Sequence, residues 1–90
     1  MMKKAAILTI SGRVQNVGFR YNTLKAAKKH DICGIVKNLH DGSVYVEAEG
    51  EETNLDQFIL WCHQGPNWAR VDHVNIQNSQ VQDYKEFSIK

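Results

Sequence analysis

The order of apolar patterns along the chain restricts its fold more than any other feature of the sequence. In order, the patterns are a strand at 4–11, a helix at 21–30, strands at 34–38 and 43–49, a helix at 51–63, a strand at 71–76 and a last short strand with Phe87 and Ile89. This β-α-β-β-α-β order, with its final strand run split in two, predicts an α+β protein. We expect the ferredoxin-like split βαβ sandwich, with two helices on one face of an antiparallel sheet. Right-handed crossovers would place the first strand inside the sheet.

The second helix has the clearest pattern, an apolar stripe at i, i+3, i+4 and i+7 that ends at Gly65-Pro66. The stripe consists of Leu55, Phe58, Ile59 and Cys62. In the first helix, Tyr21, Leu24 and Ala27 recur at helical spacing.

Local signals also shape the predicted strands. Asp41-Gly42 between two strand patterns predicts a hairpin, because glycine supplies the positive φ that the turn needs. The broken alternation at Asp72-His73 predicts a β-bulge. In the strand at 43–49, one face of the alternation should be core, namely Val44, Val46 and Ala48. The other face should be solvated, namely Tyr45, Glu47 and Glu49.

Composition narrows the class of protein. Ninety residues predict one domain, residues 1–90, and a formal net charge of +1 gives no field that would select a nucleic acid or a membrane surface. No apolar run approaches the ~20 residues that span a bilayer, and the run at 5–10 is too short for a signal peptide. We therefore expect a cytoplasmic monomer with no nucleic-acid or membrane partner. Cys33 and Cys62 lack metal-ligand spacing and are expected to be buried thiols, with a disulfide as the lesser alternative.

The stretch from Ser11 to Arg20 carries the main functional signal. A strand pattern leads into it and a helical pattern leaves it, with Gly12 and Gly18 at its two ends. A loop that enters a helix N-terminus presents unpaired N–H groups and partial positive charge, which suits an anion such as phosphate. Arg20 opposes the helix dipole unless an anion is bound, and its guanidinium matches phosphate oxygens in bidentate geometry. On spacing alone, an exposed arginine on a helix surface remains the simpler interpretation.

Two motifs together resemble the acylphosphatase family. Ile10 to Arg20 (ISGRVQNVGFR) is similar to its first signature, typically G-x-V-Q-G-V-x-F-R. Gly34 to Asn38 (GIVKN), followed by Gly42, Val44 and Gly50, is similar to the second. Asn16 stands where the family usually has glycine, and asparagine is the next best residue for a left-handed backbone. Ile35 stands where an aromatic residue is usual and should affect packing alone.

The resemblance implies a small stand-alone acylphosphatase, which hydrolyses acyl phosphates to carboxylate and inorganic phosphate without metal or other cofactor. It implies that Arg20 grips the phosphate and that Asn38 orients the attacking water for in-line attack. Backbone N–H groups of a phosphate-binding loop would hold the remaining oxygens, and that loop comprises Gln15, Asn16, Val17, Gly18, Phe19 and Arg20. Inorganic phosphate would then be both product and competitive inhibitor. Without the paired motifs, Asn38 would be interpreted as a turn residue at a strand end.

Other residues point to no chemistry. His30, His40, His63 and His73 lack the spacing of zinc ligands, and Trp61 and Trp68 are expected to pack around the second helix. An RNA-binding module of this fold would need aromatic residues on its central strands, and these strands offer Tyr45 but no aromatic-rich stretch. A metallochaperone would need C-x-x-C in the first loop, and this sequence has none there. A domain that senses phosphate without chemistry remains the main alternative to the enzyme.

Overall fold

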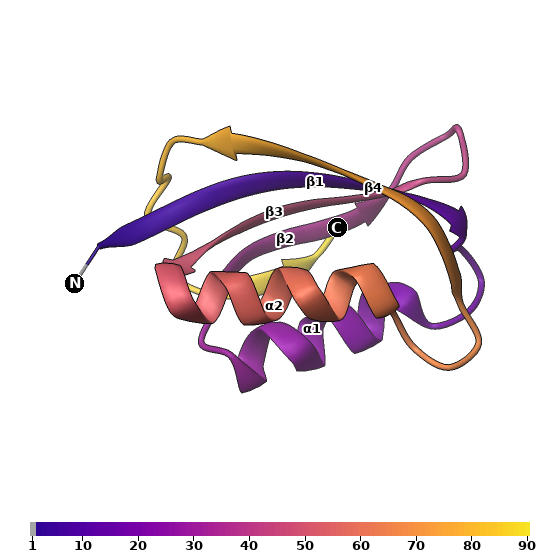
Figure 1. The fold of residues 1–90 in the computed structure, drawn as a ribbon, viewed down its shortest axis with the longest axis horizontal. Coiled ribbons are helices and arrows are strands. Elements are labelled where there is room, and N and C mark those ends of the chain that lie inside the picture. Colours follow the sequence, from indigo (N-terminus) through magenta and orange to yellow (C-terminus); the bar gives the residue numbers. More distant parts are fainter. Residues whose placement is uncertain (1) are drawn as a thin grey trace.

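The computed structural model describes residues 2–90 as one five-stranded sheet with two helices on one face (Figure 1). The elements are β1 (Lys3–Arg13), α1 (Phe19–Lys29), β2 (Cys33–Asn38), β3 (Val44–Glu51), α2 (Glu52–Gln64), β4 (Arg70–Ser79) and β5 (Phe87–Ile89). The strand order is β4-β1-β3-β2-β5, so the first strand lies inside the sheet as expected. The predicted ferredoxin-like fold is confirmed.

The sheet differs from the expected one at its β5 edge. β1 pairs antiparallel with β3 and β4, and β2 pairs antiparallel with β3, but β5 runs parallel to β2. The sheet is therefore mixed rather than purely antiparallel. The reason is the segment after β4, which crosses from one edge of the sheet to the other and brings Phe87 beside Gly34.

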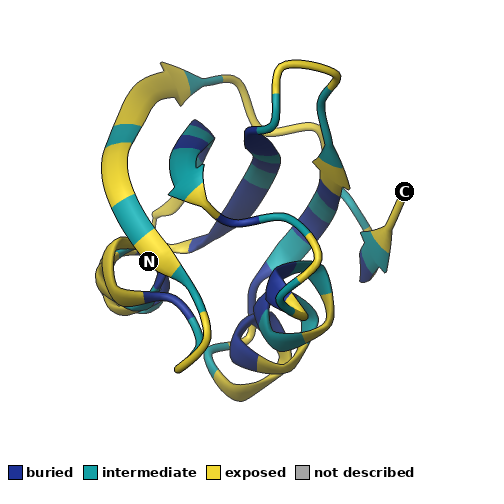
Figure 2. Cartoon of the chain, turned by 90° about the vertical axis from the view of Figure 1, so that its right-hand side faces the viewer, coloured by how far each residue is buried: buried dark blue, intermediate teal, exposed yellow. Residues whose placement is uncertain are grey.

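The core fills the space between the helices and the sheet (Figure 2). Alternate residues of β1 and β3 are buried, among them Leu8, Ile10, Val44 and Val46, as the period of two requires. They meet the α2 stripe, whose Leu55, Phe58 and Cys62 are buried as predicted. β4, at the edge, is exposed along most of its length (Figure 2).

Helix α1 begins two residues earlier than expected, and its buried face is different. Phe19, Thr23, Ala26 and Ala27 are buried, whereas Tyr21 is 60% exposed. Tyr21 shares the helical spacing of Leu24 and Ala27 but does not belong to the core, and Phe19, two positions earlier, is buried instead. Phe19 packs against the ring of Trp61, with their centroids 5.7 Å apart.

The local turn predictions hold. Between β2 and β3, the Leu39 N–H donates to the Ser43 carbonyl at 2.9 Å, and Gly42 has a φ of 94°. The bulge is also present, because the register between β1 and β4 shifts so that Asp72 has no partner in β1. Where the bulge begins, a Cβ on Gly12 would lie 2.2 Å from the Arg70 carbonyl oxygen, so this position requires glycine.

The open face of β3 is not uniformly solvated, which corrects one expectation. Glu49 is only 2% exposed, and its carboxylate accepts the main-chain N–H groups of Gln82 and Tyr84 at 2.8 and 2.7 Å. The cause is the same crossing segment between β4 and β5, which covers the end of β3. Glu47 on the same face accepts the Tyr45 hydroxyl at 2.7 Å and also the Tyr84 hydroxyl. We call these two carboxylates and their donors the Glu47–Glu49 cluster.

The cysteines and tryptophans meet expectation in part. Cys33 and Cys62 are free thiols, but only Cys62 is buried; burial raises its pKa above the ordinary range. Trp61 packs against the core as expected, whereas Trp68 is 79% exposed and does not. Within residues 2–90, no helix is long and apolar enough to cross a membrane.

Candidate active site

The loop between β1 and α1 has buried anchors at both ends. Val14 and Phe19 are 1% and 2% exposed and fix the two ends of the loop to the core. Between them, Asn16 and Gly18 adopt left-handed backbone conformations, with φ of 62° and 75°. Asn16 therefore takes the conformation that glycine would take most easily, as expected for an asparagine at this position.

The main-chain N–H groups of this loop are free. From Gln15 to Arg20 they donate to no acceptor within residues 2–90. Helix α1 has no side-chain cap and no acidic residue in its first turn, whereas Lys28 and Lys29 occupy its last turn. Unpaired donors and the positive end of the helix dipole therefore coincide in the loop. Successive main-chain N–H groups in a tight turn of this kind converge on an anion.

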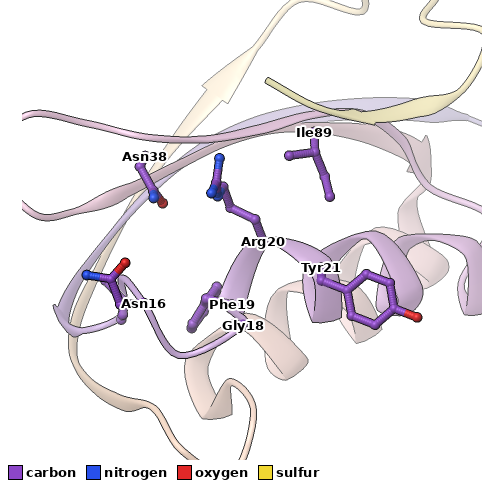
Figure 3. A pocket seen from close by; sticks show the side chains of 8 residues that line it. Asn16, Gly18, Phe19, Arg20, Tyr21, Asn38 and Ile89 are labelled. Carbon is purple, nitrogen blue, oxygen red and sulfur yellow. The ribbon is translucent and has the colours of Figure 1, made fainter.

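The loop forms one side of a cavity of about 190 Å³, which we call the site hollow (Figure 3). Its lining residues are Val14, Asn16, Gly18, Phe19, Arg20, Tyr21, Asn38 and Ile89. The side chains of Arg20 and Asn38 point toward each other across it (Figure 3). The structure thus brings together Arg20, Asn38 and the loop residues Asn16, Gly18 and Phe19. In the part of the chain that the structure describes, no carboxylate forms an ion pair with Arg20.

Asn38 carries an unsatisfied polar atom. It is the last residue of β2 and lies opposite Val44 of β3, next to the hairpin turn. Its side-chain Oδ1 is buried and has no hydrogen-bond partner within residues 2–90. A buried acceptor left unpaired costs about 1–3 kcal/mol, so few such atoms persist in folded proteins. At Asn38 the unpaired atom faces a hollow lined by a free guanidinium.

Gln15 and Val17, two of the predicted loop residues, do not line the hollow. Val17 packs against the core. The Gln15 side-chain amide instead donates two hydrogen bonds, to the Leu39 carbonyl at 2.8 Å and to the Ser43 carbonyl at 2.9 Å. This amide ties the loop to the hairpin that begins directly after Asn38. Sequence reasoning missed this role, because no local pattern relates residue 15 to a turn 24 residues later.

Tyr21 and Ile89 also line the hollow and were not predicted as site residues. The sequence placed Tyr21 on the first helix and Ile89 on a short strand. Tyr21 directly follows the first motif, and this position is the one sequence signal that could have placed it at the site. No sequence signal places Ile89 there. No group of three or more His, Cys, Asp or Glu side chains in residues 2–90 is arranged to hold a metal ion.

Several known proteins similar to this chain are named acylphosphatase. The family model described as Acylphosphatase matches residues 6–89. An acylphosphatase of Listeria welshimeri is 47% identical over 99% of this chain and 98% of its own length. One from Geobacter sulfurreducens is 41% identical over 99% of both chains. The crystal structure of acylphosphatase from Bacillus subtilis has a TM-score of 0.92 and 36% identity, and the match covers 99% of each chain.

Proposed function

The chain belongs to the acylphosphatase family and hydrolyses the carboxyl–phosphate bond of acyl phosphates, and we propose that the site hollow performs this reaction. Two side chains have the main roles in this proposal: Arg20 binds the phosphoryl group, and Asn38 orients the attacking water. The single observation that carries this assignment is the buried, unpaired Oδ1 of Asn38 in the same hollow as Arg20.

The phosphoryl group lies against the loop between β1 and α1. The Arg20 guanidinium donates to two of its oxygens, and the free N–H groups of the loop residues that line the hollow, Asn16, Gly18, Phe19 and Arg20, surround the others. Because these donors are fixed before the reaction, they stabilise charge on the equatorial oxygens without reorganising. Phosphoryl transfer requires little covalent help from a protein, so positioning and charge stabilisation supply most of the rate.

The attacking water is held at Asn38. Its Oδ1 accepts a hydrogen bond from the water, whose oxygen is then aimed at phosphorus in line with the leaving carboxylate. A P–O bond forms to this water as the bond to the acyl oxygen breaks, and the products are carboxylate and inorganic phosphate. An amide is a poor base, and the lining of the hollow includes no carboxylate or histidine. The proton therefore goes to a phosphate oxygen of the substrate itself.

We propose that this reaction needs no metal or other cofactor, because the loop donors and Arg20 supply the positive charge. The test is to mix the purified protein with benzoyl phosphate and to follow the loss of absorbance, with and without a chelator. We expect turnover that the chelator does not change and that inorganic phosphate inhibits competitively. Phosphate binding without turnover would instead identify a sensor, and loss of activity in chelator would identify a metal-dependent enzyme.

We further propose that residues 1–90 act as one domain and as a monomer in the cytoplasm. One continuous hydrophobic cluster joins both helices to the sheet, and the two cysteines are free thiols, as in a reducing compartment. Light scattering of the purified protein would show one species of about 10.3 kDa, and a mass twice as large would contradict the monomer.

A further inference from the structure

One side of the site hollow is apolar. Tyr21 and Ile89 line it and remain 60% and 40% exposed, so neither belongs to the core. In Figure 3 they lie on one side of Arg20, and Asn16 and Asn38 lie on the other. Single exposed apolar side chains are common on protein surfaces, but two that line the same hollow beside a free guanidinium form a surface for a ligand.

The fold fixes both side chains in place. Helix α1 buries Phe19 and Thr23, which turns Tyr21 outward at the mouth of the hollow. Lys25, one turn later, lies 5.6 Å from the centroid of the Tyr21 ring and limits its motion on the helix surface. Ile89 is held by the parallel pairing of β5 with Val36 of β2, and the next N–H along the chain donates to the Val36 carbonyl at 2.8 Å.

In-line attack determines which side of the hollow receives the leaving group. The water oxygen, phosphorus and the leaving oxygen lie roughly on one line. With the water at Asn38 and the phosphoryl group at Arg20 and the loop, the leaving carboxylate emerges on the side away from Asn38. That is the side of Tyr21 and Ile89 (Figure 3).

We propose that Tyr21 and Ile89 form the subsite for the acyl group and select acyl phosphates with an aromatic or branched aliphatic acyl chain over acetyl phosphate. This inference rests on the proposed roles of Arg20 and Asn38. A phenyl ring that lies over these two side chains removes apolar surface from water, which favours binding. An acetyl group is too small to cover both. The two walls of the hollow thus have separate tasks: the polar wall sets up attack, and the apolar wall sets the choice of substrate.

The test is the ratio of kcat/KM for benzoyl phosphate to kcat/KM for acetyl phosphate. We expect the wild-type ratio to exceed one and to fall about three- to tenfold in each of Tyr21→Ala and Ile89→Ala, because an open surface discriminates less than a closed pocket. Tyr21→Phe keeps the ring and should keep the ratio. Leu60→Ala removes an apolar side chain that is 62% exposed on α2, outside the hollow, and serves as the matched control.

The inhibition constant of inorganic phosphate separates this subsite from the catalytic groups. Phosphate has no acyl chain, so its inhibition constant should change less than twofold in Tyr21→Ala and Ile89→Ala. Variants that hydrolyse both substrates with the wild-type ratio would overturn the subsite and leave the proposed function intact. A wild-type protein that hydrolyses neither substrate would contradict the proposed function, and the subsite with it.

Discussion

The site hollow and the Glu47–Glu49 cluster differ in whether their polar groups are paired within the protein. In the hollow, the loop N–H groups and the Asn38 Oδ1 have no partner within residues 2–90. In the cluster, the more deeply buried Glu49 accepts two main-chain N–H groups and lies 3.7 Å from the Lys3 ammonium. The two regions lie toward opposite ends of β3, since Val44 pairs with Asn38 at one end and Glu49 pairs with Cys33 at the other.

This difference in pairing indicates that the Glu47–Glu49 cluster contributes to stability and the site hollow to catalysis. A paired buried carboxylate cannot be removed without loss of stability, because its removal leaves its buried donors without a partner. A buried acceptor without a partner, such as the Asn38 Oδ1, lowers stability and persists only where the surroundings hold it in place. Here the buried anchors Val14 and Phe19 and the Gln15 amide provide that support. Substitutions in the hollow should therefore affect catalysis, and substitutions in the cluster should affect folding.

Arg20→Ala tests the hollow most severely. We expect kcat/KM to fall about a thousandfold or more, because two charge-assisted hydrogen bonds to the phosphoryl group are lost. Competitive inhibition by phosphate should disappear, while the free energy of unfolding changes by less than about 0.5 kcal/mol. Steady-state kinetics and urea unfolding measure the two effects. Arg70→Ala is the matched control, since Arg70 pairs with Asp72 outside the hollow. Retained inhibition by phosphate would remove Arg20 from the site.

Asn38→Ala should separate catalysis from binding. We expect kcat to fall about a hundredfold, because the water is no longer oriented, while phosphate still binds within about threefold. The free energy of unfolding should stay equal or rise, because an unpaired buried oxygen is removed. Calorimetric titration with phosphate and urea unfolding measure these quantities. Lost phosphate binding, or a marked loss of stability, would show that Asn38 is a structural residue.

Glu49→Ala should give the opposite result. Its removal strands the N–H groups of Gln82 and Tyr84, so we expect the free energy of unfolding to fall by about 2–4 kcal/mol. At a temperature where the variant is folded, kcat should match the wild type. Glu51→Ala, an exposed glutamate on the same strand, is the control. A large fall in kcat with stability unchanged would contradict the division between the two regions.

Gln15→Met should lower both stability and catalysis, because the hydrogen-bonded Gln15 side chain holds the loop that forms one side of the hollow. We expect stability to fall by about 1–2 kcal/mol with the loss of two hydrogen bonds. We also expect kcat/KM to fall about tenfold, since the loop is no longer tied to the hairpin beside Asn38. Gln57→Met, on the exposed surface of α2, controls for the substitution. Unchanged kinetics would mean that the loop holds its position without this amide.

The smallest expected effect is the pH dependence of stability that comes from Glu47. Hydrogen bonds from the Tyr45 and Tyr84 hydroxyls lower the pKa of Glu47 below its ordinary 4.5, so this contribution is present above pH 4.5 and is lost as the pH falls through the lowered pKa. The same bonds raise the pKa values of Tyr45 and Tyr84 to about 12, so their contribution is lost as the pH rises from 10 through 12. Glu47→Gln should be less stable by about 1 kcal/mol at pH 7 and lose less stability on acidification. Thermal unfolding at several pH values measures this, and parallel wild-type and variant curves would contradict it.

Features set by neighbouring residues could be predicted from the sequence. The hairpin at Asp41-Gly42, the stripe of α2 and the left-handed backbone at Asn16 depend on nearby residues, and each prediction was correct. The predicted fold also requires the loop after the first strand and the end of the strand at 34–38 to lie close together, and the structure places both at the hollow.

Features that depend on distant segments could not be predicted. The burial of Glu49 depends on a segment more than 30 residues later that crosses the sheet, and the parallel pairing of β5 depends on the same crossing. The apolar wall unites Tyr21 with Ile89, 68 positions further along the chain. Periodicity reports which face of an element is apolar, but it does not report which remote segment covers that face.

The position of β1 inside the sheet affects the stage of folding at which the active site forms. β1 pairs with β4 at Ala5 and Ser79, which are far apart in the sequence. Closing the long loop between them costs conformational entropy before the strand pair can form its hydrogen bonds. Such non-local pairing slows folding relative to a helical bundle of equal size. The loop that we propose as the phosphate site leaves directly from β1, so the site is complete only once β1 has paired within the sheet. A phosphate ion that binds the folded chain and not the unfolded one would then stabilise the fold by mass action.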